Sequence, residues 1–141
     1  MTVPLFGYAP EDAQTLVVAH LRPLRRTDIE RKPGDPLPFT LVNTVPGTET
    51  VQGGIAEAVV SVHTLCDKGL GAAAARDECD KTHRRMLYLL TDPHITIGAR
   101  AAAVLYIEVP PGQSPSWQYY SDNILQKVGT YRIGLPYLAR T

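Results

Sequence analysis

Apolar residues recur at helical spacing in two stretches of the chain. After Pro10, they return every three or four positions and predict a helix that ends near Pro23. The inward face of this helix is expected to hold Ala13, Leu16, Val17, His20 and Leu21. A second helix is predicted over residues 72–91, where Asp92-Pro93 ends it. Its inward face is expected to hold Cys79, His83, Met86, Leu87 and Leu90.

Other stretches alternate with the period of a strand. Residues 39–45 and 55–65 predict two strands that form a hairpin with a long loop. In the second of them, one face carries Ala56, Ala58, Val60 and Val62, and the other carries Glu57, Val59, Ser61 and His63. Residues 103–109 and 124–137 predict two further strands, the last with bends or bulges at Gly129 and Gly134.

The predicted order is helix, strand, strand, helix, strand, strand, with short connections. This order favours a single domain over residues 1–141. We expect an α+β fold with a mostly antiparallel four-stranded sheet and two main helices packed on one face. The segment 22–32 holds five Arg and Lys residues among acidic ones, which predicts a solvated connector.

The overall amino-acid composition disfavours several classes of protein function. The 141 residues are 44% hydrophobic and 20% charged, which suits a folded domain with a real core. Basic and acidic residues number 14 each, and zero net charge disfavours a dedicated nucleic-acid binder. No signal peptide is visible, and no apolar stretch approaches the ~20 residues that span a bilayer. The two cysteines form no disulfide framework, so free thiols in a reducing interior are expected.

The sharpest chemical pattern is His63-x2-Cys66-x12-Cys79-x3-His83, which nearly matches the ligand spacing of a zinc site. The competing interpretation is that these residues pack the core, because a buried cysteine behaves as a small hydrophobe. A domain of this length also needs no metal to fold. The sequence therefore favours packing, and we assign no metal ligand and no cofactor. Stoichiometric zinc that is lost on Cys66→Ala would reverse this choice.

No catalytic motif is present. The chain lacks a nucleophile elbow, a Walker loop, a dinucleotide fingerprint and a His-Glu-x-x-His helix. Ser61 and His63 share a strand face, but proximity in sequence does not make them a nucleophile and a base. We therefore assign no catalytic residue and expect that the protein is not an enzyme.

Three aromatic residues, Trp117, Tyr119 and Tyr120, follow a proline-rich loop. Such residues serve as interface anchors and equally as anchors between a loop and the core, so both interpretations stay open. Arg132 is a further interface candidate, since it could contact partner carboxylates or DNA phosphates.

Four segments in order resemble a known family. They are residues 36–39 (Pro-Leu-Pro-Phe), residues 58–64 (Ala-Val-Val-Ser-Val-His-Thr), residues 80–93 with Asp-Lys-Thr-His-Arg-Arg-Met-Leu followed by Leu-Thr-Asp-Pro, and residues 128–135 (Val-Gly-Thr-Tyr-Arg-Ile-Gly-Leu). Together they resemble the tail terminator, or minor tail, proteins of long-tailed phages that infect actinobacteria. His63 and His83 match the family pattern, which implies a structural neighbourhood of these two histidines, whereas Cys66 and Cys79 do not match.

The resemblance implies a structural virion protein at the head–tail junction, assembled in the host cytoplasm. Such subunits form a homo-oligomer, expected to be a hexameric ring, that caps the tail tube and ends its polymerisation. The expected partners are the major tail tube protein and a head–tail connector or stopper protein. DNA passes through the lumen without specific binding, and no membrane is involved. The alternatives are another neck or completion protein, or a small zinc-binding or hydrolytic domain.

One departure from the family concerns the last strand. Pro136 stands where a basic residue is usual, and because proline cannot donate to a ladder, this strand end is expected at a sheet edge. The loops 46–54 and 110–122 are the expected contact surfaces, because of their length and their Gly, Pro and aromatic content.

Overall fold

A computed structural model describes residues 3–47, 49–110, 116–121 and 123–139, with the backbone alone at 52, 100, 116–121 and 139. The helical elements are α1 (Ala13–Leu21), α2 (Ala72–Leu87) and two short 3-10 turns, η1 (Lys68–Leu70) and η2 (Tyr88–Leu90). The strands are β1 (Tyr8–Pro10), β2 (Thr27–Asp28), β3 (Phe39–Thr44), β4 (Thr50–Gln52), β5 (Ile55–Asp67), β6 (His94–Ile97), β7 (Arg100–Ala103), β8 (Tyr106–Glu108), β9 (Ser116–Ser121) and β10 (Ile124–Ala139).

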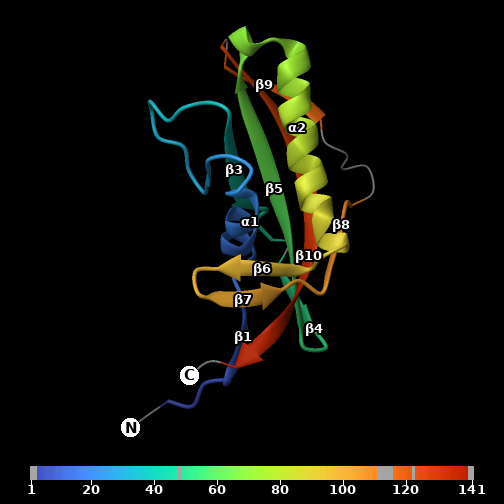
Figure 1. Cartoon of the computed structure of the whole chain (residues 1–141). Coiled ribbons are helices and arrows are strands. Elements are labelled where there is room, and N and C mark those ends of the chain that lie inside the picture. Colours follow the sequence, from blue (N-terminus) through green and yellow to red (C-terminus); the bar gives the residue numbers. More distant parts are fainter. Residues whose placement is uncertain (1–2, 48, 111–115, 122, 140–141) are drawn as a thin grey trace.

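The expected four-stranded sheet is wrong. Within the described residues, seven strands form one large curled sheet, and β1 extends it along the far end of β10 (Figure 1). The two longest strands, β5 and β10, lie at its centre. β3 and β4 pair with β5, and β1, β8 and β9 pair with β10. The pairings are antiparallel except that β2 runs parallel to β3, and β6 and β7 form a separate hairpin.

Several strands could not be predicted from the sequence for physical reasons. β1, β2 and β4 are two or three residues long, which is too short to display an alternation. The strand expected over residues 103–109 is interrupted at Val104–Leu105 and divides into β7 and β8. Both Val104 and Leu105 donate backbone hydrogen bonds, to Pro93 and Gly134 respectively, so this bend joins the small hairpin to the large sheet.

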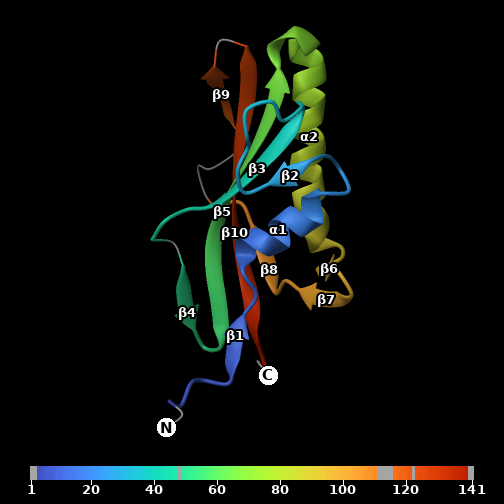
Figure 2. The ribbon, with the colours of Figure 1, turned by 90° about the vertical axis from the view of Figure 1, so that its left-hand side faces the viewer.

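Both helices and the β6–β7 hairpin cover one face of the sheet (Figure 2). Asp12 rather than Pro10 begins α1, because its carboxylate caps the helix by accepting from Thr15 N at 3.1 Å. The expected inward face of α1 is buried throughout. On α2, the expected Cys79 and Met86 are buried, together with Ala75 and Thr82, whereas His83 and Leu87 are half-buried. Leu90 is 67% exposed, because η2 replaces the last turn of the expected helix and changes the direction of its side chains.

The register between β5 and β10 determines which side chains form the core. Val60 and Val62 of β5 lie opposite Tyr131 and Gly129 of β10, and their side chains face the helices. The two strands stay in register from Asp67 opposite Ile124 to Ile55 opposite Pro136, so the expected bulges at the two glycines do not occur.

The glycines of β10 make room for aromatic rings instead. A Cβ at Gly129 would lie 2.7 Å from the hydroxyl of Tyr131, and one at Gly134 would collide with the ring of Tyr106. Pro136 also corrects an expectation, since β10 is central rather than at an edge. The carbonyl of Gly134 accepts from Leu105 on the side away from β5. Pro136, two residues later, therefore points its nitrogen to that same side, in the gap between β8 and β1.

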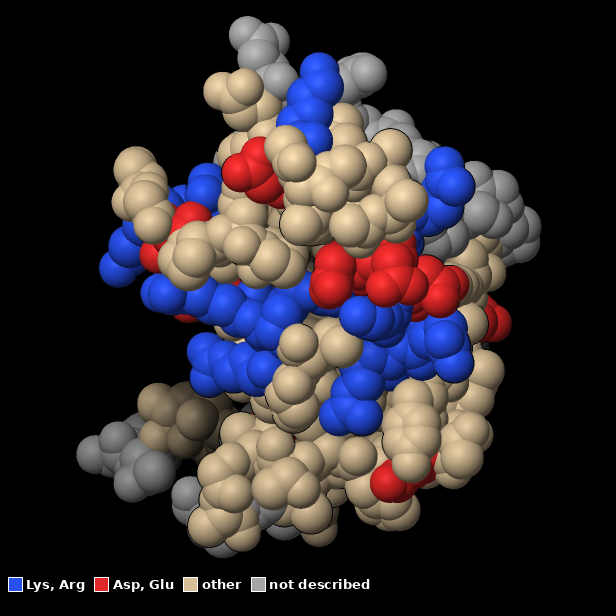
Figure 3. Space-filling model, turned by 45° about the horizontal axis from the view of Figure 1, so that its top comes forward, with Lys and Arg blue, Asp and Glu red and all other residues tan. Residues whose placement is uncertain are grey.

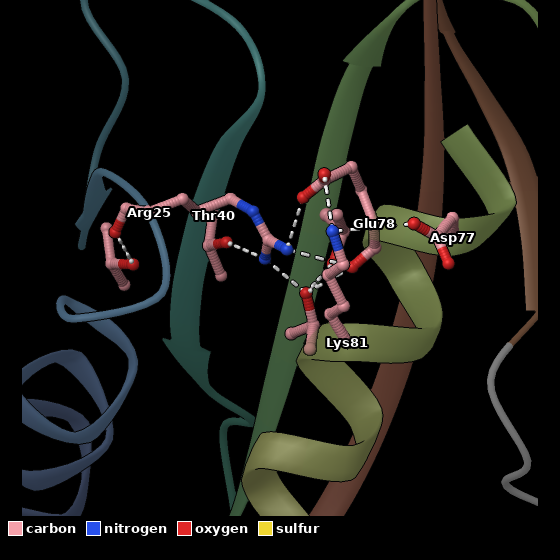
Figure 4. A network of polar contacts seen from close by, with 8 residues as sticks. Arg25, Thr40, Asp77, Glu78 and Lys81 are labelled. Carbon is pink, nitrogen blue, oxygen red and sulfur yellow. Dashed lines mark hydrogen bonds and ion pairs between the residues drawn. The ribbon is translucent and has the colours of Figure 1, made fainter. Parts of the chain in front are cut away.

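A buried arginine joins the segment after α1 to α2 (Figure 4). Arg25 has a 5% exposed side chain and contacts Glu78 Oε2 at 2.8 Å and the Glu78 carbonyl at 2.9 Å. It also donates to Thr40 of β3 at 3.1 Å and to Thr82 of α2. Thr64 of β5 donates to Thr82, so β5 is linked to the guanidinium through this hydroxyl. The segment is therefore not simply a solvated connector, because Arg25 anchors it to the core.

We predict that Arg25→Met lowers the free energy of unfolding by about 2–3 kcal/mol, since Glu78 and two hydroxyls lose their shared donor. The matched control is Arg26→Met, whose side chain is 59% exposed and forms an ion pair with Asp35 at 3.3 Å. That substitution should cost about 1 kcal/mol or less. Urea denaturation monitored by circular dichroism measures both, and equal losses would contradict a special role for Arg25.

Candidate functional site

The four residues with zinc-like spacing do not converge. Residues three positions apart in a strand point to opposite faces, so His63 and Cys66 of β5 lie on different sides of the sheet. His63 hydrogen-bonds Ser61 Oγ and Gln126 Oε1, each at 3.1 Å, on the face away from the helices. His83 of α2 lies on the helical side, so the expected neighbourhood of the two histidines is not formed.

The other three residues lie between α2 and the sheet. Both thiols are buried, and the hydrogen bond with Cys66, together with burial, raises the pKa of Cys79. His83 Nδ1 bonds the hydroxyl of Tyr131 at 2.7 Å, and burial lowers the pKa of the His83 ring. Among the described residues, no group of three or more His, Cys, Asp and Glu side chains is arranged to hold a metal ion. These side chains act as polar links within the core.

Ser61, His63 and Gln126 form a chain of polar contacts that invites comparison with a nucleophile, a base and an orienting group. The serine lies in the middle of a central strand, opposite Asn43 of β3 and Thr130 of β10. The backbone N–H groups nearby serve the ladders on both sides and are not free to stabilise an oxyanion. The arrangement therefore links strands on the sheet surface and offers no evident route to acyl transfer.

The most distinctive polar cluster surrounds Arg132 on the same face. Its Nε lies 3.3 Å from Glu57 Oε1, and its Nη1 donates to Glu108 Oε1 at 2.6 Å. Tyr106 Oη donates to the other oxygen of Glu57. The three charged side chains come from β5, β8 and β10, which are adjacent in the order β5–β10–β8. They remain 31–53% exposed, so another molecule can reach them.

Tyr106 holds this cluster to the sheet. Tyr106 lies opposite Gly134 of β10, and because the glycine has no side chain, the tyrosine ring can lie against the strand. The hydrogen bond to Glu57, with burial and the nearby carboxylates, raises the pKa of Tyr106 to about 12. The phenol therefore stays protonated at neutral pH and acts as a donor to Glu57.

Two hollows flank β4 beside this cluster. One, of about 270 Å³, lies between the start of α1 and β4, and its apolar lining includes Ala13, Ala56, Ala58 and Leu135. The other, of about 320 Å³, is lined by Thr50, Ile55, Glu57 and Tyr106. Four carboxylates also line the first hollow, from Glu11, Asp12, Glu49 and Glu57. The loop 46–54, expected to be a contact surface, thus contains β4 and borders both hollows; residue 48 lies outside the described residues.

The three aromatic interface candidates, Trp117, Tyr119 and Tyr120, lie on β9. The backbones of Trp117 and Tyr119 pair with Lys127 and Leu125 of β10, and the pairing shifts register around Tyr120. The side chains of these three aromatic residues lie outside the described part of the chain, as do residues 111–115 and 122 of the loop 110–122.

Sequence reasoning found Arg132 but missed its partners. Glu57 offered a signal, because it is the single carboxylate within the alternating run of residues 55–65. Tyr106 and Glu108 offered none, since their approach to Arg132 depends on the pairing of β8 with β10.

Comparison with known proteins identifies no relative: no protein-family model and no curated protein matches the sequence. None of the helices in the described residues has the length and apolar character needed to cross a bilayer.

We predict that acid weakens the fold through the buried His20 and the half-buried His83. Burial lowers the pKa of His20 and of His83 below 6.5, so under more acidic conditions the unfolded chain takes up protons that the folded protein does not. Stability should be complete above pH 6.5 and fall as the pH decreases toward 5, by at most about 1.4 kcal/mol per pH unit for each histidine. Chemical denaturation at several pH values measures this slope.

His20→Gln combined with His83→Gln should flatten the slope, because glutamine does not titrate. His94→Gln is the matched control, since the side chain of His94 is 69% exposed. A slope that survives the double substitution would assign the acid sensitivity to other groups.

Proposed function

We propose that this protein is a tail terminator of a long-tailed phage, a structural virion protein that forms a ring on the end of the tail tube. The observation that carries the proposal is the ordered set of four segments that resemble this family. In the folded chain the first segment leads into β3 at Phe39, the second lies in β5, the third runs from α2 through η2, and the fourth lies in β10. These elements pack against one another. Phe39 lies opposite Leu65, just beyond the second segment, and Val128 lies opposite His63.

The charge distribution is compatible with DNA passing by without being gripped. Figure 3 shows a band of Lys and Arg side chains across one face, directly beside a patch of Asp and Glu. On α2, Lys81 contacts Asp77 at 3.4 Å and Arg84 contacts Asp80 at 3.7 Å. Neighbouring opposite charges cancel the long-range field that would hold phosphates. Net charge for the whole chain is zero.

A terminator needs two unlike faces, one for the tube and one for the connector, and lateral contacts that close the ring. Lateral contacts of this kind join different surfaces of neighbouring copies. The cluster at Arg132 and the loop 46–54 are our candidates for such surfaces, because they combine exposed charge with the apolar side chains of Val51 and Ile55, which are 64% and 37% exposed.

The decisive experiment inactivates the gene in its phage and examines the particles by electron microscopy. A terminator is expected to leave tails of uncontrolled length that are not joined to heads. Tails of normal length beside unjoined heads would instead support a head-side completion protein. Normal virions would overturn both assignments. Deleting residues 51–53 without any loss of ring formation or tail joining would exclude the loop 46–54 as a contact.

We predict that Arg132→Ala yields a folded protein that joins tails poorly. Its ion pairs are partly exposed, so the melting temperature should fall by only a few degrees. Joining should suffer because Glu57 and Glu108 then present an uncompensated negative pair. Arg84→Ala, which removes a 77% exposed side chain from α2, is the matched control and should join tails normally. Counting infectious particles after complementation checks both, and full activity of the Arg132 variant would remove this cluster from the contact surface.

A further inference from the structure

The segment before β1 presents apolar side chains to solvent. Val3, Leu5 and Phe6 are 72%, 87% and 75% exposed, and no other large hydrophobic residue in the described chain is as exposed as these three. Tyr8, at the start of β1, is 53% exposed. We call residues 3–8 the arm. Its intramolecular contacts between rings join Phe6 with Tyr8 and with Tyr137 of β10.

The arm projects beyond the sheet. β1 pairs antiparallel with the end of β10, with Tyr8 opposite Ala139, so the residues before Tyr8 continue past the last rung of the ladder. Figures 1 and 2 show this segment running away from the lower end of the sheet. Exposed apolar side chains gathered in one short segment mark a contact surface.

A hollow with an apolar floor lies elsewhere on the same chain. The hollow of about 270 Å³ has a floor of small or buried apolar residues, Ala56, Ala58 and Leu135, and Val51 forms part of its wall. It opens where the helices no longer cover the sheet, between the start of α1 and β4. None of the described residues of the arm lines it. Among the described strands, β4 pairs with β5 alone, which leaves its other edge able to accept an extended segment.

We propose that the arm of one copy docks in the hollow beside β4 of a second copy. Leucine and phenylalanine side chains supply apolar groups of the size that such a hollow accepts, and the arm carries no charge that the four carboxylates around the hollow would repel. Arm and hollow are different surfaces, so the contact is heterologous and can repeat from copy to copy. The proposal does not rest on the tail terminator assignment, since it concerns self-association of this chain.

The arm of a second copy can reach this hollow more directly than the arm of the same chain. The pairing of β1 with β10 directs the arm away from the start of α1, where its own hollow opens. Residues 3–7 span at most about 17 Å, and they would have to reverse over β1 to return. A neighbouring copy imposes no such reversal.

Cross-linking between two single-cysteine additions tests the contact directly. Leu5→Cys and Val51→Cys proteins, each with a different affinity tag, are mixed without any tube or head protein and oxidised with glutathione disulfide. The expected result is a disulfide-linked heterodimer, because docking brings the two positions within bonding reach. Cys66 and Cys79 are buried and can stay in place, and the unsubstituted protein should give no dimer.

The control pairs Leu5→Cys with Leu90→Cys, a similarly exposed position on η2. Heterodimer no greater than in this control would overturn the proposal. A chain that carries both Leu5→Cys and Val51→Cys provides a second check at low protein concentration. Efficient closure of a disulfide within a single chain would show that the arm folds onto its own hollow, which also overturns the proposal.

Sedimentation adds a measurement without cross-linking. Leu5→Ser combined with Phe6→Ser should raise the self-dissociation constant at least about tenfold, whereas Leu90→Ser should leave it unchanged. Equal effects of the two changes would contradict docking of the arm. Because these experiments use this chain alone, their failure would leave the tail terminator assignment intact, and failure of that assignment would leave the contact intact.

Discussion

The antiparallel pair of β5 and β10 determines where almost every other part of the molecule lies. The two strands stay in register over thirteen residues of β5, from Ile55 to Asp67. β3 and β4 attach to β5, and β1, β8 and β9 attach to β10. A slip of one residue would turn either Val60 and Val62 of β5 or Tyr131 of β10 out of the core, so burial of these side chains fixes the register. The same register sets Arg132 beside Glu57 on the opposite face.

Two arginines then show how burial changes the role of an ion pair. Arg25 is almost completely buried, and its guanidinium is shared among Glu78, Thr40 and Thr82. Removing it would leave a carboxylate without its main partner, so its role is to hold the segment after α1 against α2. Arg132 is one-third exposed and faces solvent together with Glu57 and Glu108. Water screens the ion pairs of Arg132 with Glu57 and Glu108, so they add little to the stability of the fold. These charged groups remain available to contact another molecule.

Local patterns predicted the buried face correctly for α1 and for β5. The inward face of α1 and the alternation of residues 56–63 needed only periodicities of 3.6 and 2. The zinc-like spacing counts positions without following side-chain direction along β5, where His63 and Cys66 lie three positions apart and therefore on opposite faces. The number of strands could not be predicted, since β2 and β4 are only two and three residues long and become strands by pairing with β3 and β5. The partners of Arg25 and Arg132 are likewise products of tertiary pairing.

The distribution of satisfied and unsatisfied groups indicates what could drive assembly. His63 bonds Ser61 and Gln126, and Arg132 bonds Glu57 and Glu108, so these polar groups already have partners. The exposed groups that gain most from contact are therefore apolar, above all the arm and the wall of the hollow at Val51. Burial of such groups is favourable without directional bonds, while neighbouring charges decide the orientation of the partner. With zero net charge, copies of this chain meet little long-range repulsion, which is compatible with the proposed contact between copies.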